Sequence, residues 1–289
     1  MDLTEGQYQI GDVKFGRGTK IRVVSVEPVG YEVAVGDRPL PMSDEIRFTK
    51  DYKQPGEMQF QLAVLDNYLL ESMLDTPINP EDYGIVPASK LLEELKYEWS
   101  GDNVRLSWGA VKPLTYRAAG YSRMLYGRPR NFAAGPLKER PGWYGVTASY
   151  KLASSHSFEE EYSQELISPT ATGTWGGSLS RAGGALAPAW PKITIVGPIS
   201  NPVVKIGPHT VNVTHTVSAG QGIELNSEPW QRRAITSTGL NIGAKLPSST
   251  YLEDLRIPPE VTWNIALHGG STTAATKMLV QWQEAYHAI

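Results

Sequence analysis

The strongest constraint on the fold of this chain is a strict alternation of apolar and polar residues in its second half. Residues 210–217 and 261–267 both alternate in this way. A period of two places neighbouring side chains on opposite faces of a β-strand, one face in a core and the other in water. Turn-forming residues separate these stretches, and the whole chain of 289 residues holds 28 Gly and 21 Pro. The second half is therefore predicted to be purely β.

The pattern predicts strands in the second half over residues 162–167, 192–197, 202–206, 210–217, 222–225, 261–269 and 277–286. Strands of this length with one apolar face pack economically as two antiparallel sheets placed face to face. We therefore predict a sandwich of about eight strands.

The first half combines strands with one helix. Residues 20–28 and 31–35 are β-branched runs on either side of Gly30, which predicts a hairpin. Residues 58–65 alternate, with Phe60, Leu62 and Val64 on one face. Further strands are expected over 104–111 and 143–152.

The predicted helix covers residues 87–99. Its apolar stripe consists of Leu91, Leu92, Leu95 and Trp99, which share one face at helical spacing. Pro87 suits the first turn, and Gly101 follows the expected end. The first half is therefore predicted to be mainly β with one α-helix.

The density of charge divides the chain. Residues 1–150 hold 38 charged side chains, whereas residues 151–289 hold 19. We predict two domains, residues 1–155 and residues 156–289.

Composition excludes several classes of protein. The chain has no cysteine, so disulfide scaffolds, thiolate zinc sites and iron–sulfur clusters are excluded. With 40% hydrophobic residues and a net charge of −3, the chain does not resemble a disordered protein. The near-neutral charge argues against nucleic acid as the main partner. No apolar run is long enough to span a membrane, and the first residues do not resemble a signal peptide.

Motifs for catalysis and metal binding are missing from the sequence. The five histidines, His156, His209, His215, His268 and His287, show no helical metal-ligand spacing, although a two-His site at His209 and His215 stays open as an alternative. Glycoside hydrolysis needs two carboxylates held at a fixed separation. We interpret the neighbouring Glu253 and Asp254 as surface charge rather than as such a pair. We predict no catalytic, metal-binding or cofactor-binding residue, and no cofactor. The rival hypothesis is a glycan hydrolase with an unrecognised carboxylate pair.

Two neighbouring segments carry opposite charge. Residues 105–140 are basic and interspersed with aromatic residues, whereas residues 66–102 are acidic. Such segments suit complementary faces, either within one subunit or between subunits, and arginine suits interface ion pairs. Arg128 and Arg130 are therefore our candidates for a subunit interface. Nucleic-acid binding by stacking and phosphate contacts is the alternative for this segment.

Several segments resemble one family of phage proteins. A strand ending in Gly, a short turn, Asn-Pro and another strand occur in ITIVGPISNPVVKI (193–206), and Gly-Leu-Asn follows at 239–241. The chain then closes with IPPEVTWNIALHG (257–269). Upstream come a strand, a helix containing Leu91-Leu92, a strand, Arg-Pro-Arg at 128–130 and another strand. This order is similar to that of the distal tail proteins of long-tailed, non-contractile phages (siphophages), a family of minor tail proteins.

The resemblance implies a structural virion protein of the tail tip or baseplate, made in the host cytoplasm. It implies an N-terminal β-sandwich-like domain with one helix that assembles into a homo-hexameric ring, and a C-terminal galectin-like β-sandwich outside that ring. The implied partners are further copies of the chain, the tail-tube protein, a tail-associated tip protein and the tape-measure protein.

Tryptophans suggest a second function. Trp99, Trp108 and Trp263 lie in periodic segments and are predicted to be core residues. Trp175 and Trp190 lie in turn-rich segments of the galectin-like domain, where a ring that points outward would stack on sugar. The alternative function is therefore a carbohydrate-binding accessory protein of the tail tip that contacts host cell-wall glycan.

Overall fold

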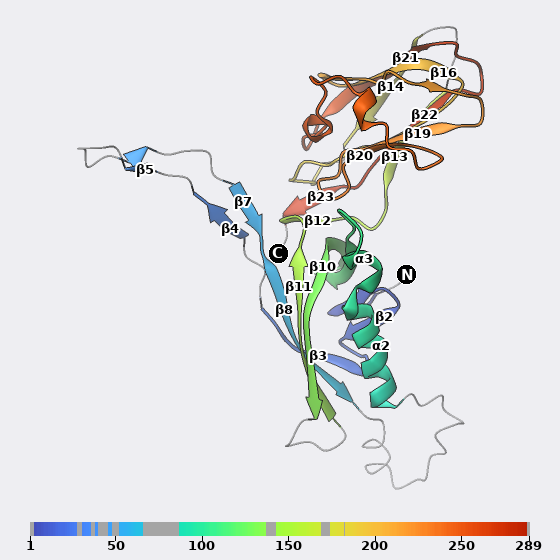
Figure 1. The fold of residues 1–289 in the computed structure, drawn as a ribbon. Helices are drawn as coiled ribbons and strands as arrows, with labels where there is room; N and C mark the ends of the chain where they lie inside the picture. Colours follow the sequence, from blue (N-terminus) through green and yellow to red (C-terminus); the bar gives the residue numbers. More distant parts are fainter. Residues whose placement is uncertain are drawn as a thin grey trace. The chain divides into compact units, whose positions relative to one another are not determined.

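The computed structural model is mainly β and divides into two compact units, with the division between Ser157 and Phe158 (Figure 1). The structure describes residues 3–27, 31–35, 38–39, 46–47, 52–65, 87–136, 143–168, 174–181 and 183–287. We call the part before the division unit 1 and Phe158–His287 unit 2, and we describe each by itself.

Unit 1 is built on an antiparallel sheet. Its strands run in the order β2 (Val13–Gly16), β1 (Gln7–Ile10), β9 (Lys112–Ala118), β10 (Tyr121–Pro136), β11 (Trp143–Leu152), β8 (Glu57–Leu65) and β3 (Ile21–Val26). The short strand β12 (His156–Phe158) contains the division between the units. Phe60, Leu62 and Val64 of β8 are buried and Gln59 and Gln61 are exposed, which confirms the alternation seen in the sequence.

The predicted hairpin around Gly30 is wrong in its pairing. Both strands form, but β3 pairs with β8, and β4 (Tyr31–Ala34) pairs with β7 (Tyr52–Pro55). The strand β8 has nine residues, whereas β4 has four, so β8 is the longer pairing partner for β3. In this pairing Ile21 lies opposite Val64. A second small ladder joins β5 (Arg38–Pro39) to β6 (Ile46–Arg47). Gly30 itself lies outside the described residues.

The predicted helix is confirmed as α2 (Ala88–Ser100). Leu95 and Trp99 are fully buried against the sheet, and Leu91 and Leu92 pack at the margin of the same core. Gly101 ends the helix with a φ of 61°, a left-handed conformation that glycine adopts without strain.

The strand expected over residues 104–111 does not form. The chain instead makes the short helix α3 (Asp102–Arg105) directly after Gly101, followed by turns up to β9. The left-handed Gly101 restarts a helical turn, since the backbone amides of Val104 and Arg105 both donate to the Gly101 carbonyl.

An aromatic cluster forms the centre of unit 1. The Phe15 ring lies 5.6 Å from Phe60 and 6.1 Å from Trp99, and the Phe60 and Trp99 rings lie 5.7 Å apart, all edge to face. The Trp99 indole also donates a 3.0 Å hydrogen bond to the Ser149 carbonyl of β11. Helix and sheet are therefore joined by packing and by a buried polar contact.

Unit 2 is a β-sandwich of two five-stranded antiparallel sheets. The first sheet runs in the order β13 (Ser163–Ile167), β22 (Lys277–Trp282), β15 (Lys192–Val196), β19 (Gly222–Asn226) and β20 (Arg233–Thr236). The second runs β14 (Thr174–Ser180), β21 (Thr262–Gly270), β16 (Ile199–Ile206) and β17 (His209–Asn212), with β18 (Thr216–Val217) also on β16. The short helices η2 (Gly243–Lys245) and η3 (Leu252–Asp254) and the strand β23 (Ala285–His287) complete the unit.

The sandwich core lies between these two sheets. Ile193 and Ile195 from one sheet and Val204 and Leu267 from the other are fully buried in a single cluster. The predicted sandwich is confirmed, with β14 and β20 as strands that the sequence pattern did not reveal.

Two predicted strands are interrupted. Residues 213–215 belong to no strand. The backbone amide of Val213 donates to the Pro202 carbonyl, and that of Thr214 donates to the Lys245 carbonyl. The predicted strand over 277–286 divides into β22 and β23, since the buried Gln283 and Glu284 between them bond to other parts of unit 2.

In the described ranges, each helix is too short or too polar to cross a membrane.

Candidate interaction surfaces

The two tryptophans predicted to bind glycan are both buried. Trp175 on β14 is 3% exposed and belongs to the sandwich core. Trp190 is 9% exposed, and its ring lies 6.0 Å from Phe158 and 6.4 Å from Trp230. The expectation that these rings point outward is wrong, because both rings fill the interior of unit 2. A buried ring offers no face on which a sugar can stack.

The two arginines predicted at a subunit interface lie on β10 with different surroundings. Arg128 is half-buried, and its guanidinium donates hydrogen bonds of 2.5 Å to the Ala110 carbonyl and 2.7 Å to the Ser107 carbonyl. Arg130 is exposed. Arg128 therefore holds the turn before β9 in place, while Arg130 presents its charge to solvent. The interface role of both residues stays a prediction.

Among the described residues, the opposed charge segments meet in an ion pair between α2 and β9. Lys112 of β9 forms an ion pair with Glu98 of α2, and its ammonium also donates to the Glu98 carbonyl at 2.7 Å. Arg117 donates to the Leu3 carbonyl at 3.1 Å. Lys112 and Arg117 of the basic segment therefore make contacts within the subunit. Residues 66–86 and 137–140 of these segments lie outside the described residues.

Trp108 contradicts its sequence prediction. We expected a core residue, but Trp108 is fully exposed at 104% of its reference area, and nearby Leu106 is 95% exposed. Both lie in the turn segment between α3 and β9, which we call the 106–110 loop. The sequence pattern did not reveal the exposure of these residues, because it predicted a strand over this segment. Trp99 is core as predicted, and Trp263 packs at the edge of the sandwich core.

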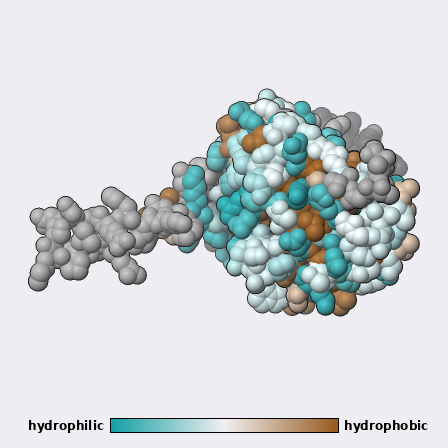
Figure 2. All heavy atoms as spheres, turned by 90° about the horizontal axis from the view of Figure 1, so that it is seen from above, coloured by the Kyte–Doolittle hydropathy of each residue, from teal (hydrophilic) through white to brown (hydrophobic). Residues whose placement is uncertain are grey.

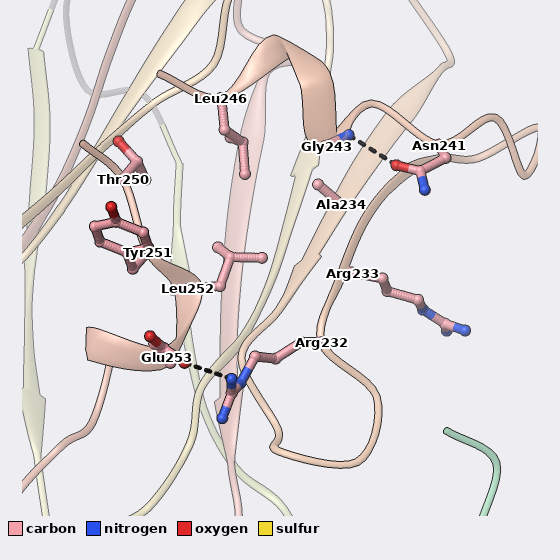
Figure 3. A pocket seen from close by; sticks show the side chains of 10 residues that line it. All are labelled: Arg232, Arg233, Ala234, Asn241, Gly243, Leu246, Thr250, Tyr251, Leu252 and Glu253. Carbon is pink, nitrogen blue, oxygen red and sulfur yellow. Dashed lines mark hydrogen bonds and ion pairs between the residues drawn. The ribbon is translucent and has the colours of Figure 1, made fainter. Parts of the chain in front are cut away.

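A solvent-open pocket of about 380 Å³ lies in unit 2 (Figure 3). Arg232 and Glu253, which both line it, form a 2.6 Å ion pair, with side chains 38% and 48% exposed. The exposed Tyr251 stands beside this pair. The Asn241 side-chain oxygen accepts a 2.8 Å hydrogen bond from the Gly243 backbone amide. The NH₂ group of Asn241 points away from this hydrogen bond. The pocket offers an aromatic ring and polar groups to a small polar ligand.

The pKa values of two carboxylates near β19 are shifted in opposite directions. Burial raises the pKa of Glu228, and hydrogen bonds from Asn226 and Tyr162 offset only part of that rise. For Glu224, burial also raises the pKa, but hydrogen bonds and charges from Lys192 and Arg233 outweigh it, so the pKa is lowered. Neither carboxylate lines the pocket described above.

The histidines show no metal-ligand cluster. Among the described residues, no group of three or more metal-ligating side chains is placed to hold an ion. The His209 ring instead packs edge to face on Trp263 at 5.8 Å.

The surface carries apolar and polar residues side by side. Figure 2 shows a face on which hydrophilic residues predominate and hydrophobic residues gather in a central strip. Exposed apolar residues are therefore not confined to the 106–110 loop.

Three solved structures resemble this chain over nearly its whole length. The Dit (gp 19.1) protein of phage SPP1, described as a paradigm of the hub adsorption apparatus in phages that infect Gram-positive bacteria, matches with a TM-score of 0.52 and 16% identity. That match covers 92% of this chain and 94% of the SPP1 chain. Structures of the phage P2 baseplate in its activated conformation, with Ca and with Sr, match with TM-scores of 0.54 and 0.53.

The P2 matches have 8% and 9% identity and cover 95% of this chain and 97% of the baseplate chains. No protein-family model and no curated protein matches the sequence. The fold that the sequence resemblance implied is confirmed: this chain has the fold of phage hub and baseplate proteins.

Proposed function

We propose that this protein is a structural component of a long, non-contractile phage tail. In this proposal it forms the hub ring at the distal end of the tail tube and attaches the tail tip. The observation that carries the proposal is the likeness of nearly the whole chain, both units included, to phage hub and baseplate proteins. The protein acts in the virion, at the tail tip.

Each domain has its own role in this proposal. Residues 1–155 form the homo-hexameric ring, and residues 156–289 form a galectin-like β-sandwich outside it. The tail-tube protein contacts one side of the ring, a tail-associated tip protein contacts the other, and the tape-measure protein passes through. A closed ring requires head-to-tail contacts between different patches of the same chain.

We further propose that the protein has no enzymatic activity. The lining of the pocket in unit 2 contains one carboxylate, Glu253, and this group is paired with Arg232. Glycoside hydrolysis requires two carboxyl groups that face one substrate. Release of sugar from host cell walls by the purified protein would contradict this part of the proposal.

The solution mass of the purified protein tests the ring. Light scattering is expected to give a discrete particle of about six chains, since rings close at a fixed number of subunits. The mass of one chain is 31.7 kDa. Mass that stays at this value up to high protein concentration would contradict the ring.

A carbohydrate-binding accessory role is the second candidate. The specific observation in its favour is the pocket with Tyr251, because the flat face of an aromatic ring suits the apolar face of a sugar. Binding of cell-wall polysaccharide that Tyr251→Ala abolishes and Tyr121→Ala leaves intact would support this candidate. Tyr121 is a matched control because it is an exposed tyrosine of unit 1.

A further inference from the structure

Two side chains that line the pocket in unit 2 offer hydrogen-bond donors to a ligand. Arg232 donates to Glu253 through one atom, Nη1. Among the described residues, the Nε and Nη2 atoms of Arg232 have no hydrogen-bond partner. The side-chain oxygen of Asn241 accepts the bond from the Gly243 backbone amide, so the NH₂ group of Asn241 is left for a ligand. Both side chains therefore favour a ligand that is rich in hydrogen-bond acceptors.

Positive charge also collects at this pocket. Among the described residues, its lining contains two cations, Arg232 and Arg233, and one carboxylate, Glu253. Arg233 donates from Nε and Nη2 to Glu224, which lies outside the lining. Residues 232–256 hold four basic side chains and two acidic ones, whereas unit 2 as a whole holds eight basic and ten acidic ones. The pocket therefore lies in a positively charged segment of a negatively charged unit, which favours an anionic ligand.

The ion pair between Arg232 and Glu253 leaves Arg232 open to a second anion. The two side chains are 38% and 48% exposed, and ion pairs this exposed to water contribute little to stability. A guanidinium binds a carboxylate or a phosphate through two parallel N–H donors. Arg233 shows this use of the Nε and Nη2 edge in its contact with Glu224. The same edge of Arg232 is available to the anionic group of a ligand.

The body of the pocket is apolar and is supported by the core of unit 2. Leu246 and Leu252 line the pocket and pack against the sandwich core. Figure 3 shows these two leucines between Tyr251 on one side and Asn241 on the other. A site that is held in shape before binding loses less conformational entropy when a ligand binds. The leucines and the exposed Tyr251 ring suit a ligand with an apolar face, such as a sugar ring.

We propose that this pocket binds an acidic sugar, which is a sugar that carries a carboxylate or a phosphate group. The Nε and Nη2 atoms of Arg232 donate to the anionic group, the NH₂ group of Asn241 donates to a further oxygen, and the Tyr251 ring lies against the apolar face of the sugar. The inference narrows the second candidate function, on which it rests, from glycan in general to acidic sugars. It does not depend on the hub ring.

Titration calorimetry of the full-length protein tests the proposal with three probes of similar size. Glucuronic acid carries a carboxylate, glucose 6-phosphate carries a phosphate, and glucose carries neither. At least one of the two acids is expected to bind about 10-fold more tightly than glucose, because hydrogen bonds to an ionised group are stronger than those to a neutral one. The acid that binds more tightly identifies the anionic group that the pocket prefers.

Two variants of the ion pair are expected to have opposite effects. Arg232→Gln removes the guanidinium and is expected to weaken binding of the acid about 10-fold. Glu253→Gln removes the competing carboxylate but keeps Arg232, so the same acid is expected to bind about 3-fold more tightly. A purely structural role of the ion pair would weaken binding in both variants.

Lys205→Gln is the matched control for these variants. It removes one exposed positive charge from unit 2 at a position outside the pocket, on β16. Binding of the acid is expected to be unchanged in this variant. Circular dichroism checks that all three variants are folded.

The outcomes separate this inference from the two proposed functions. Equal binding of glucose and both acids overturns the inference and leaves glycan contact standing. Acid binding that Lys205→Gln weakens as much as Arg232→Gln reflects only the overall charge and overturns the inference. Weaker binding in Glu253→Gln overturns it as well. Absence of binding for all three probes overturns the inference and the pocket as a glycan site together, while the hub ring is tested separately by the solution mass.

Discussion

At the residue scale, the same side chain has opposite surroundings at two positions close in sequence. Trp99 is fully buried, whereas Trp108 is fully exposed. The helical spacing with Leu95 reveals the burial of Trp99 from sequence alone. The exposure of Trp108 follows from Gly101 and Arg128, which place the 106–110 loop outside the sheet. Those are tertiary contacts that a local pattern does not contain.

Truncation of Trp99 is expected to destabilise unit 1. Trp99→Ala removes a ring packed on Phe15 and Phe60 and leaves the Ser149 carbonyl without its donor. Large-to-small changes of this kind cost about 3–5 kcal/mol. Denaturant unfolding followed by circular dichroism measures the loss. Tyr97→Ala is the matched control on the same helix, because Tyr97 is 74% exposed, and a comparable loss in both variants would contradict the packing described here.

The raised pKa of Glu228 has a consequence for stability against pH. Burial makes the folded state bind this proton more tightly than the unfolded state. The contribution of Glu228 to the stability of the folded state is therefore present below the ordinary carboxyl pKa of 4.5. It is lost as pH rises through the raised pKa of Glu228. Glu228→Gln is expected to raise the melting temperature at pH 7 and to leave it unchanged at pH 3.

Glu224 provides the opposite case. Its pKa is lowered because Lys192 and Arg233 outweigh the effect of burial. The contribution of Glu224 to folding stability is therefore present above the ordinary carboxyl pKa and is lost as pH falls through the lowered pKa. Glu224→Gln is expected to lower the melting temperature at pH 7. A fall of the same size for Glu228→Gln would contradict the assigned direction for that residue.

At the element scale, the periodic segments are predictable and their connections are not. The helix α2 and the strand β8 follow from spacing alone, because one apolar face is enough to specify each of them. The partner of β3 depends on which edge of the sheet is free, and no turn signal encodes that choice. Buried polar residues cause the break between β22 and β23, where Glu284 pairs with the buried Arg181 at 2.6 Å.

The turn between α2 and α3 depends on Gly101. Gly101→Ala is expected to cost about 1–2 kcal/mol, the penalty for a side chain in the left-handed conformation. An added Cβ at this position lies 3.5 Å or more from Val104 and Pro129, so steric overlap adds little. Gly135→Ala is the control, because a Cβ there meets no atom within 4 Å. Equal unfolding free energies for the two variants would show that the backbone conformation at Gly101 is unimportant.

At the scale of the whole molecule, the fold is shared with phage hub and baseplate proteins at 8–16% identity. Such a fold depends on alternation, turn position and element order, all of which tolerate replacement of individual residues. The same features made the fold class and the resemblance recognisable in the sequence.

The interaction surfaces were less predictable than the fold. Trp175 and Trp190 were expected outside and are inside, while Trp108 was expected inside and is outside. Turn-rich sequence around a tryptophan does not determine its exposure, because neighbouring segments cover it or leave it open. Arg128 shows the same limit, since its bonds to the 106–110 loop join residues about 20 positions apart in the sequence.

The most direct test of the central claim is the position of this protein in the virion. Gold-labelled antibodies against the purified chain are applied to virions of the phage that encodes it and are examined by electron microscopy. We predict label at the distal end of the tail, at the junction between tube and tip. Label on the head or along the whole tube, or virions without this protein, would contradict the hub assignment.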